Sequence, residues 1–187
     1  MRANAKDSLS TNIALEFQNV DLAKVTPEID SLSLGGTING GLNVFKFKDT
    51  YFPKSMLDIK DFSVNGFNLG AFEAKIEGNS SLTNYDVQLK IQDDLKESFS
   101  AVGNLDVSGV HSNLDLNLNF KDFILNPLNP FGDGVITNIR GKVSGFSKIS
   151  GRVEKPQISG DLRLDSGGIS IPYLNIDYAF DDKTRVK

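Results

Sequence analysis

The sequence predicts an all-β protein made of antiparallel strands, with little or no helix. Apolar residues and glycines occupy alternate positions in several short runs between residues 141 and 180. Strand-like runs follow one another at intervals of roughly ten residues from Met56 onward, which is the spacing of an antiparallel meander. No segment repeats its apolar residues with the period of about 3.6 residues that marks an amphipathic helix.

The alternation between residues 139 and 180 places apolar side chains and glycines on one face of each strand, because successive strand side chains point to opposite faces. Charged and amide side chains occupy the positions in between. The residues that share the apolar parity are Ile139, Gly141, Val143, Gly145, Ile149, Gly151, Val153, Ile158, Gly160, Leu162, Leu164, Leu174, Ile176, Tyr178 and Phe180.

Glycines on an apolar strand face have two interpretations. Glycine weakens a strand interior and generally marks a bulge, a bend or the close approach of another group. The glycines therefore either let a strongly curved sheet fold over itself or leave room along an apolar trough for a guest.

Composition narrows the classes of function. The chain has 187 residues, a formal net charge of -4 and a pI near 5.0. This length suffices for one ordinary domain with a core, and the mildly acidic balance gives no electrostatic footprint for nucleic acid or for an anionic membrane surface. The absence of cysteine excludes disulfides, thiolate metal sites and a cysteine nucleophile. No segment is apolar and long enough to be a signal peptide, a membrane anchor or a bilayer-spanning helix.

The first quarter of the chain predicts a strand, a short helical turn and a second strand. Residues 13–17 alternate as a strand, and residues 22–25 form the only plausible helical turn, which ends before Pro27. Residues 36–47 resume the alternation. Phe45 and Phe47 then switch parity, which predicts a bulge or corner followed by a bend at residues 51–53.

The middle of the chain predicts a series of hairpins. The dipeptide Asn65-Gly66 is either a type I′ turn or a bulge, because apolar residues flank it on both sides. Residues 114–120 give the cleanest strand, with Leu and Phe alternating against Asp and Asn. Pro127 and Pro130 exclude a central strand from the connection that follows.

The two halves of the chain echo each other. Phe17, Val20 and Leu22 have the spacing of Phe120, Phe123 and Leu125, and the segment GTING at residues 36–40 matches GKVSG at residues 141–145. We expect one elongated unit over residues 1–187, with two related halves at about residues 11–107 and 114–187.

Several segments together resemble the C-terminal region of the TamB family, within the AsmA-like group of bridge-like periplasmic proteins. The segments are residues 61–70, 139–145, 149–153, 156–160, 162–164 and 171–178. The resemblance covers most of the chain and is strongest between residues 120 and 181. It implies a long curved antiparallel sheet folded lengthwise into an open apolar groove. The family's N-terminal membrane anchor is missing and the pattern stops at Lys187, so we expect this chain to be a fragment of a longer protein.

The resemblance also implies a function, partners and a location. It predicts a groove-forming segment of a periplasm-spanning protein, anchored in the inner membrane of a Gram-negative bacterium through parts missing from this chain. Such a protein supports outer-membrane biogenesis by moving phospholipids between membranes, or by assisting the translocation and assembly of outer-membrane or secreted proteins. The implied partners are phospholipid acyl chains or client outer-membrane strands, and a TamA-like barrel of the Omp85 type.

The predicted binding residues follow the apolar parity of the C-terminal half. They are Leu105, Val107, Leu114, Leu116, Leu118, Phe120, Ile139, Val143, Ile149, Val153, Ile158, Leu162, Leu164, Ile176 and Tyr178.

No catalytic or metal site and no cofactor is predicted, and we expect the protein not to be an enzyme. His111 is the only histidine and lies in a turn, so a catalytic triad or a histidine metal cluster has nothing to build on. The pairs at residues 93–94 and 181–182 lack the ligand spacing of a calcium loop. The glycosylation sequon at residues 79–81 is a short match that also arises by chance.

Two functions from different classes remain. In the first, an uncapped apolar trough carries lipid acyl chains or client strands. In the second, a structural or adhesive β-sandwich packs its apolar faces against each other. A sandwich needs two separable sets of strands, whereas a trough tolerates glycine on its inner face. The resemblance favours the trough.

Overall fold

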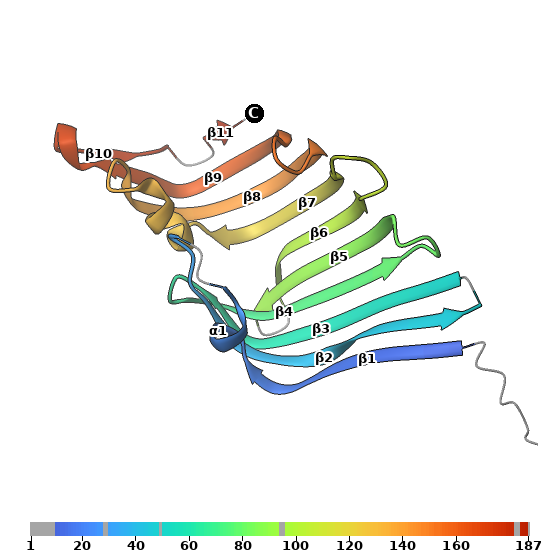
Figure 1. Cartoon of the computed structure of the whole chain (residues 1–187). Coiled ribbons are helices and arrows are strands. Elements are labelled where there is room, and N and C mark those ends of the chain that lie inside the picture. The colour runs from blue at the N-terminus through green and yellow to red at the C-terminus, as the bar shows by residue number, and fades with distance from the viewer. Residues whose placement is uncertain (1–9, 28–29, 49, 94–95, 182–183, 187) are drawn as a thin grey trace, which may run out of the picture.

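The chain forms one open antiparallel sheet whose strands lie side by side in the order of the sequence (Figure 1). The structure is a computed structural model that describes residues 10–27, 30–48, 50–93, 96–181 and 184–186. Its strands are β1 (Ser10–Asp21), β2 (Leu34–Phe47), β3 (Thr50–Val64), β4 (Phe67–Gly78), β5 (Asn84–Asp93), β6 (Lys96–Asp106), β7 (Asn113–Ile124), β8 (Thr137–Arg152), β9 (Gln157–Ile171), β10 (Ile176–Ala179) and β11 (Arg185–Val186). Both β10 and β11 pair with β9. The predicted all-β class, with a curved antiparallel sheet that is not closed, is confirmed.

Helix is confined to short turns. The helical turn predicted at residues 22–25 is present as α1 (Leu22–Val25), where the Asp21 carboxylate accepts a hydrogen bond from the Ala23 amide at 3.1 Å. The proline-containing connection forms the 3-10 helix η1 (Asn126–Gly132), and η2 (Pro172–Leu174) joins β9 to β10. Within the described part of the chain, no helix has the length and apolar character needed to cross a membrane.

Of the two irregularities predicted for the hairpins, one is confirmed and the other is wrong. Asn65 and Gly66 have φ values of 52° and 81° and connect Val64 directly to its partner Phe67, which confirms a two-residue turn rather than a bulge. The bulge at Phe45 and the bend at residues 51–53 are wrong. The β2–β3 ladder runs without interruption from Val44 opposite Pro53 to Phe47 opposite Thr50. The sheet stays regular because the two phenylalanine rings lie on the polar face.

Register shifts between neighbouring strands gather along one line across the sheet, which we call the crease. On β1, β3, β7, β8 and β9 the shift is accompanied by a residue with left-handed backbone conformation. These residues are Asn19, Asp61, Asp122, Asn138 and Ser166, with φ values between 51° and 52°. Short polar side chains tolerate this conformation because they bond locally to the backbone. An extra residue in one strand bends it, so the crease turns the sheet toward its apolar side.

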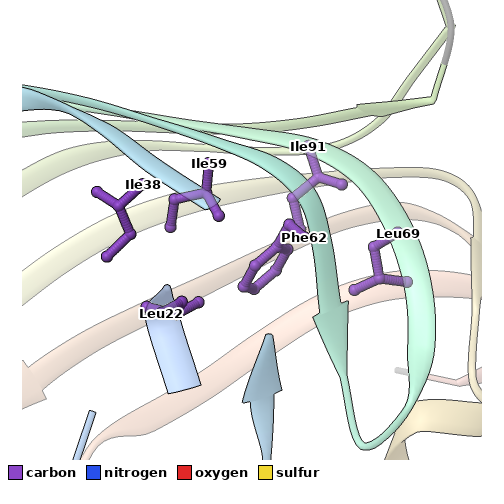
Figure 2. Packing of buried hydrophobic residues seen from close by; sticks show 6 residues of the cluster. All are labelled: Leu22, Ile38, Ile59, Phe62, Leu69 and Ile91. Carbon is purple, nitrogen blue, oxygen red and sulfur yellow. The ribbon is translucent and has the colours of Figure 1, made fainter. Parts of the chain in front are cut away.

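The buried core lies inside this bend (Figure 2). Figure 2 shows Phe62 on β3 and Leu69 on β4 where the two strands curve around the cluster, with Leu22 of α1 facing them. Ile38, Ile59 and Ile91 complete the six buried residues. Partly buried aromatic rings extend the core, with the Phe62 and Phe72 centroids 5.0 Å apart and those of Phe99 and Phe120 5.2 Å apart. The core therefore occupies the end of the sheet that carries α1.

Asn65 joins three segments at the end of the sheet that carries α1. The Asn65 backbone amide donates to the Ser33 carbonyl oxygen, and Asn65 Oδ1 accepts from the Ser33 amide, both at 2.8 Å. Asn65 Nδ2 donates to the carbonyl oxygen of Pro127 at 2.7 Å. Pro127 is buried and belongs to η1, which follows β7. Asn65 thus ties the β3–β4 turn both to the start of β2 and to an element 62 residues further along the chain.

The sequence echo corresponds to equal local registers. In the first pair Phe17 lies opposite Gly40 and Val20 opposite Ile38; in the second, Phe120 lies opposite Gly145 and Phe123 opposite Val143. The two residues between each apolar pair include the left-handed Asn19 or Asp122. The repeated spacing therefore marks two copies of the same bulged strand pair. The division into two related halves stays a prediction.

Candidate functional site

The apolar face of the sheet is the candidate site, and the register assembles it from cross-strand rows. One row, which we call the crease row, borders the crease and contains Val20, Ile38, Ile59, Phe72, Ile91, Phe99, Phe120, Gly145 and Leu162. A parallel row further from the crease, which we call the outer row, contains Leu15, Leu42, Ser55, Ile76, Val87, Gly103, Leu116, Ile149 and Ile158. Between them lies a row with Leu57, Ala74, Leu89, Ala101 and Leu118. Direct cross-strand neighbours on one face contact each other, so the rows form a continuous apolar surface.

Most of the predicted binding residues lie together on this face. Leu105 lies opposite Leu114, Leu116 opposite Ile149, and Val143 opposite both Phe123 and Leu164. Leu118, Phe120, Ile158 and Leu162 occupy the three rows. Ile176 and Tyr178 alternate along β10 with Asp177, whose carboxylate bonds Arg140 and Ser170 on the polar face.

Three predicted residues fall at strand ends or in the irregular part of β8. Val107 follows the last residue of β6, and its amide donates to the Thr83 carbonyl at 2.7 Å. Val153 lies in the turn after β8, where its amide donates to Ser112 O at 2.9 Å. The Ile139 amide donates to Asn129 Oδ1 at 2.7 Å, beside the register shifts of β8. These three are therefore separate from the regular rows.

The sequence-based list omits the N-terminal half of the same surface. Residues of β1 to β6, from Leu15 to Ala101, share rows with the predicted ones through an unbroken chain of strand pairs. The signal that identifies them is the same alternation, carried through each hairpin to the next strand. Parity applied along the whole chain extends the predicted face from the five strands β6 to β10 to the ten strands β1 to β10.

Two glycines on this face, Gly145 and Gly40, lie where the neighbouring strand leaves no room for a side chain. A Cβ atom added to Gly145 would lie 3.1 Å from the Leu162 Cα and still closer to the Asp161 carbonyl oxygen, both on the adjacent strand. The equivalent atom on Gly40 would collide with Met56 in the same way. Both glycines have positive φ, at 135° and 116°. At these positions glycine therefore permits close approach of neighbouring strands in a curved sheet, the first of the two interpretations.

Exposure divides the apolar face into a closed end and an open end. Near the crease, Ile38 and Ile59 are each 6% exposed, because the bend, α1 and the core rings cover them. In the outer row, Leu15 on β1 is 52% exposed and Ile158 on β9 is 69% exposed, and the apolar residues of β4, β5, β7 and β8 between them are half-buried. All described strands belong to a single sheet, so no second layer of strands covers this end. Large exposed apolar surfaces on soluble domains generally mark a binding site.

A charged cleft of about 620 Å³ is lined by residues of β4 to β8, among them Leu69, Lys96, Lys121, Asp122 and Lys142. Lys96 Nζ lies 2.7 Å from Asp122 Oδ2, and Lys121 Nζ lies 3.0 Å from Glu97 Oε1. Hydrogen bonds from these lysines lower the pKa of the Asp122 and Glu97 carboxyls. Because Lys96 and Lys121 already have carboxylate partners, these two lysines have less to offer a ligand than the apolar face has.

The chemical groups of the turns do not assemble into a site. His111 is exposed, with its Nδ1 2.7 Å from an Arg152 guanidinium nitrogen and 3.6 Å from Glu154 Oε1. Among the residues with described positions, no three His, Asp or Glu side chains come together as metal ligands. Asp94 and Asp182 lie outside the described residues.

Comparison with known proteins adds no relative. No family model matches the chain, and no curated protein or solved structure is significantly similar to it.

Proposed function

We propose that this chain binds an extended apolar guest along the apolar face of its sheet and performs no catalysis. The observation that carries the proposal is the continuity of the apolar rows across nine strands, with an open end that no described strand covers. Burial of each methylene group contributes about 0.8 kcal/mol, so an acyl chain of about sixteen carbons gains roughly 10 kcal/mol before the cost of ordering it. The elongated guest that the face fits best is a phospholipid acyl chain.

The resemblance to the TamB family supports a wider setting for the same proposal. The chain would be one segment of a periplasm-spanning, inner-membrane-anchored protein that works with a TamA-like barrel of the Omp85 type in outer-membrane biogenesis. A client outer-membrane strand is the second guest to consider, because the unpaired edge of β1 offers backbone hydrogen bonds to an extended chain.

Photo-crosslinking with matched positions tests the guest. A photoreactive residue at Leu116 or Leu162 faces the apolar side, whereas one at Asn117 or Arg163 faces the polar side and is exposed. Incubated with fluorescent phospholipid, the purified chain should be labelled at the first pair and not at the second. Equal labelling at all four positions, or none, would contradict lipid binding on this face. Native mass spectrometry should show the same lipid retained.

A charge substitution separates the proposal from the structural or adhesive alternative. Leu116→Glu places a carboxylate in the outer row, where it stays partly hydrated beside an open face. We expect the sheet to stay folded by circular dichroism and phospholipid labelling to be lost. If copies of this chain instead pack these faces together as a sandwich, the same change buries an unpaired charge. Unfolding of the variant, combined with no lipid labelling of the unmodified face, would favour the structural role.

A further inference from the structure

Three phenylalanine rings lie on the polar face at the tip of the β2–β3 hairpin. Phe45 and Phe47 on β2 and Phe52 on β3 are 42%, 45% and 51% exposed. Phe45 lies opposite Phe52 in the ladder, and their ring centroids are 6.0 Å apart. They occupy the parity that carries Lys, Glu, Asp and Asn elsewhere in the sheet. Nothing in the core or in the apolar face accounts for these rings.

Lysines alternate with the rings along the same tip. Lys46 Nζ lies 5.0 Å from the centroid of Tyr51, and Lys48 Nζ lies 5.6 Å from that of Phe47. Neither ammonium group forms an ion pair with a carboxylate among the described residues. Residues 45–54 contain three lysines and one aspartate, whereas the whole chain has 20 basic and 24 acidic residues. Lys46 and Lys48 therefore make the tip locally basic, although the net charge of the whole chain gives no footprint for an anionic surface.

Few carboxylates lie near Lys46 and Lys48 among the described residues around the tip. On one side β1 presents the uncharged residues Ser10, Thr11 and Asn12 opposite Phe47, Lys46 and Phe45. On the other side the Tyr51 amide donates to the Ser80 carbonyl at 3.2 Å, in a turn with no charged residue between positions 79 and 84. Further along β3, Glu77 is matched by both Lys54 and Lys75, at 3.1 and 3.3 Å.

We propose that the tip of the β2–β3 hairpin docks on the surface of an anionic phospholipid bilayer. Aromatic rings and lysines are the side chains that favour the interface between headgroups and acyl chains, and each ammonium near anionic lipid adds attraction. The cores of protein–protein interfaces are depleted of lysine, which argues for lipid over a protein partner. The inference goes beyond guest binding on the apolar face and stands without it. The tip lies at the end of the sheet away from α1 (Figure 1), so docking would bring the open end of the apolar face to the bilayer.

A single tryptophan reports docking, because the chain contains none. We expect the emission of Phe52→Trp to shift to shorter wavelength with vesicles of equal phosphatidylcholine and phosphatidylglycerol, and to stay unshifted with phosphatidylcholine alone. The matched control is Phe146→Trp, since Phe146 is 70% exposed on the polar face and lies far along the sheet on β8. High salt should reverse the shift, because it screens the lysines. Phe47→Trp serves as a second reporter if Phe52→Trp fails to fold.

Further substitutions in the Phe52→Trp chain separate the contribution of the lysine charges from that of the aromatic rings. Lys46→Glu with Lys48→Glu, and separately Phe45→Ser, should each lower the vesicle partition coefficient by roughly tenfold or more while circular dichroism stays unchanged. No shift at either reporter, or an equal shift at Phe146→Trp, would overturn the proposal. A shift without vesicles that grows with protein concentration would also overturn it and would identify a second copy of this chain as the partner.

Discussion

Asn65 shows how much of this fold rests on single side chains. Its left-handed backbone forms part of the β3–β4 turn, and its side chain accepts a hydrogen bond from the Ser33 amide and donates one to the Pro127 carbonyl oxygen. A third bond, from the Asn65 backbone amide to the Ser33 carbonyl oxygen, does not depend on the side chain. Backbone conformation and side-chain bonding are separable contributions here, because glycine adopts positive φ without strain but has no side chain.

We therefore expect Asn65→Gly to lower the free energy of unfolding by about 1–2 kcal/mol through the lost bonds, and Asn65→Ala to lower it by about 1 kcal/mol more through backbone strain. Urea denaturation followed by circular dichroism measures both. Asn117→Ala, an exposed position on the polar face, is the control and should change stability by less than about 0.5 kcal/mol. Equal losses in the two Asn65 variants would refute the strain component.

The ionisation of Asp122 makes the stability of the sheet at the crease depend on pH. Its carboxylate accepts a hydrogen bond from Lys96 at 2.7 Å and one from Ser144 at 3.2 Å, and the Lys96 contact is the main cause of its lowered pKa. A carboxyl whose pKa is lower in the folded state stabilises the fold above its unfolded pKa, near 3.9, and loses that contribution as pH falls. The stability contribution of Asp122 should therefore be present at neutral pH and vanish in acid.

Comparison of the original chain with Asp122→Asn tests this, because asparagine keeps the tolerance for left-handed backbone and removes the titration. The difference in unfolding free energy between the two chains should be largest near neutral pH and should disappear as the pH falls below about 4. Lys96→Met should reduce the same difference at neutral pH. A difference that is independent of pH would show that the carboxylate charge contributes nothing.

At the scale of elements, the crease depends on residues that tolerate left-handed backbone. Asp61 is exposed and has φ of 52°, and its side chain makes no hydrogen bond or ion pair within the described part of the chain. We expect Asp61→Val to lower the unfolding free energy by about 1–2 kcal/mol, because a β-branched residue is strained there. Asp61→Asn should be nearly neutral.

Lys60→Val is the matched control for that prediction. Lys60 is the exposed neighbour of Asp61, lies opposite Thr37 at the border of the same register shift, and lacks the left-handed backbone, so a β-branched residue suits it. In thermal unfolding of the three variants, only Asp61→Val should have a melting temperature below that of the original chain. If Lys60→Val is destabilised equally, the effect belongs to the surface of β3 and not to the crease.

The alternation of residues predicts the strands and one apolar face because burial on one side of a sheet imposes a period of two. The same rule fails at the crease, where Phe17 and Val20, or Phe120 and Phe123, keep one face although two residues separate them. One of the two intervening residues, Asn19 or Asp122, adopts left-handed backbone, so the alternation shifts by one residue and both apolar side chains stay on the same face. Only Asn, Asp or Ser at that position signals the slip.

The hairpin tip was missed for the opposite reason. Phe45 and Phe47 change parity with no register shift, and the rule that apolar side chains face the interior turns this into a predicted bulge. Their rings instead lie among polar neighbours, which local packing does not explain. Such a conflict between pattern and backbone is expected at a functional surface, which is why we propose a docking role for the tip.

At the scale of the whole molecule, the two margins of the sheet differ. β9 is partly covered, because β10 pairs with residues 168–171 and β11 with residues 162–163. Among the described residues β1 pairs only with β2, so its outer side, over 12 residues, has no described strand beside it. Unpaired strand edges template association with other chains unless charge or irregularity blunts them.

We therefore expect the chain to self-associate through β1 as its concentration rises, and light scattering coupled to size exclusion measures this. Ile13 is 67% exposed beside the edge, so Ile13→Lys should favour the monomer by placing a like charge at the new contact. Val110→Lys is the control, because Val110 is 97% exposed in the β6–β7 turn. A strict monomer at high concentration, or equal weakening by the control, would count against an open edge. Association through β1 would extend the rows of the apolar face into a second copy, since strand pairing continues each row across the junction.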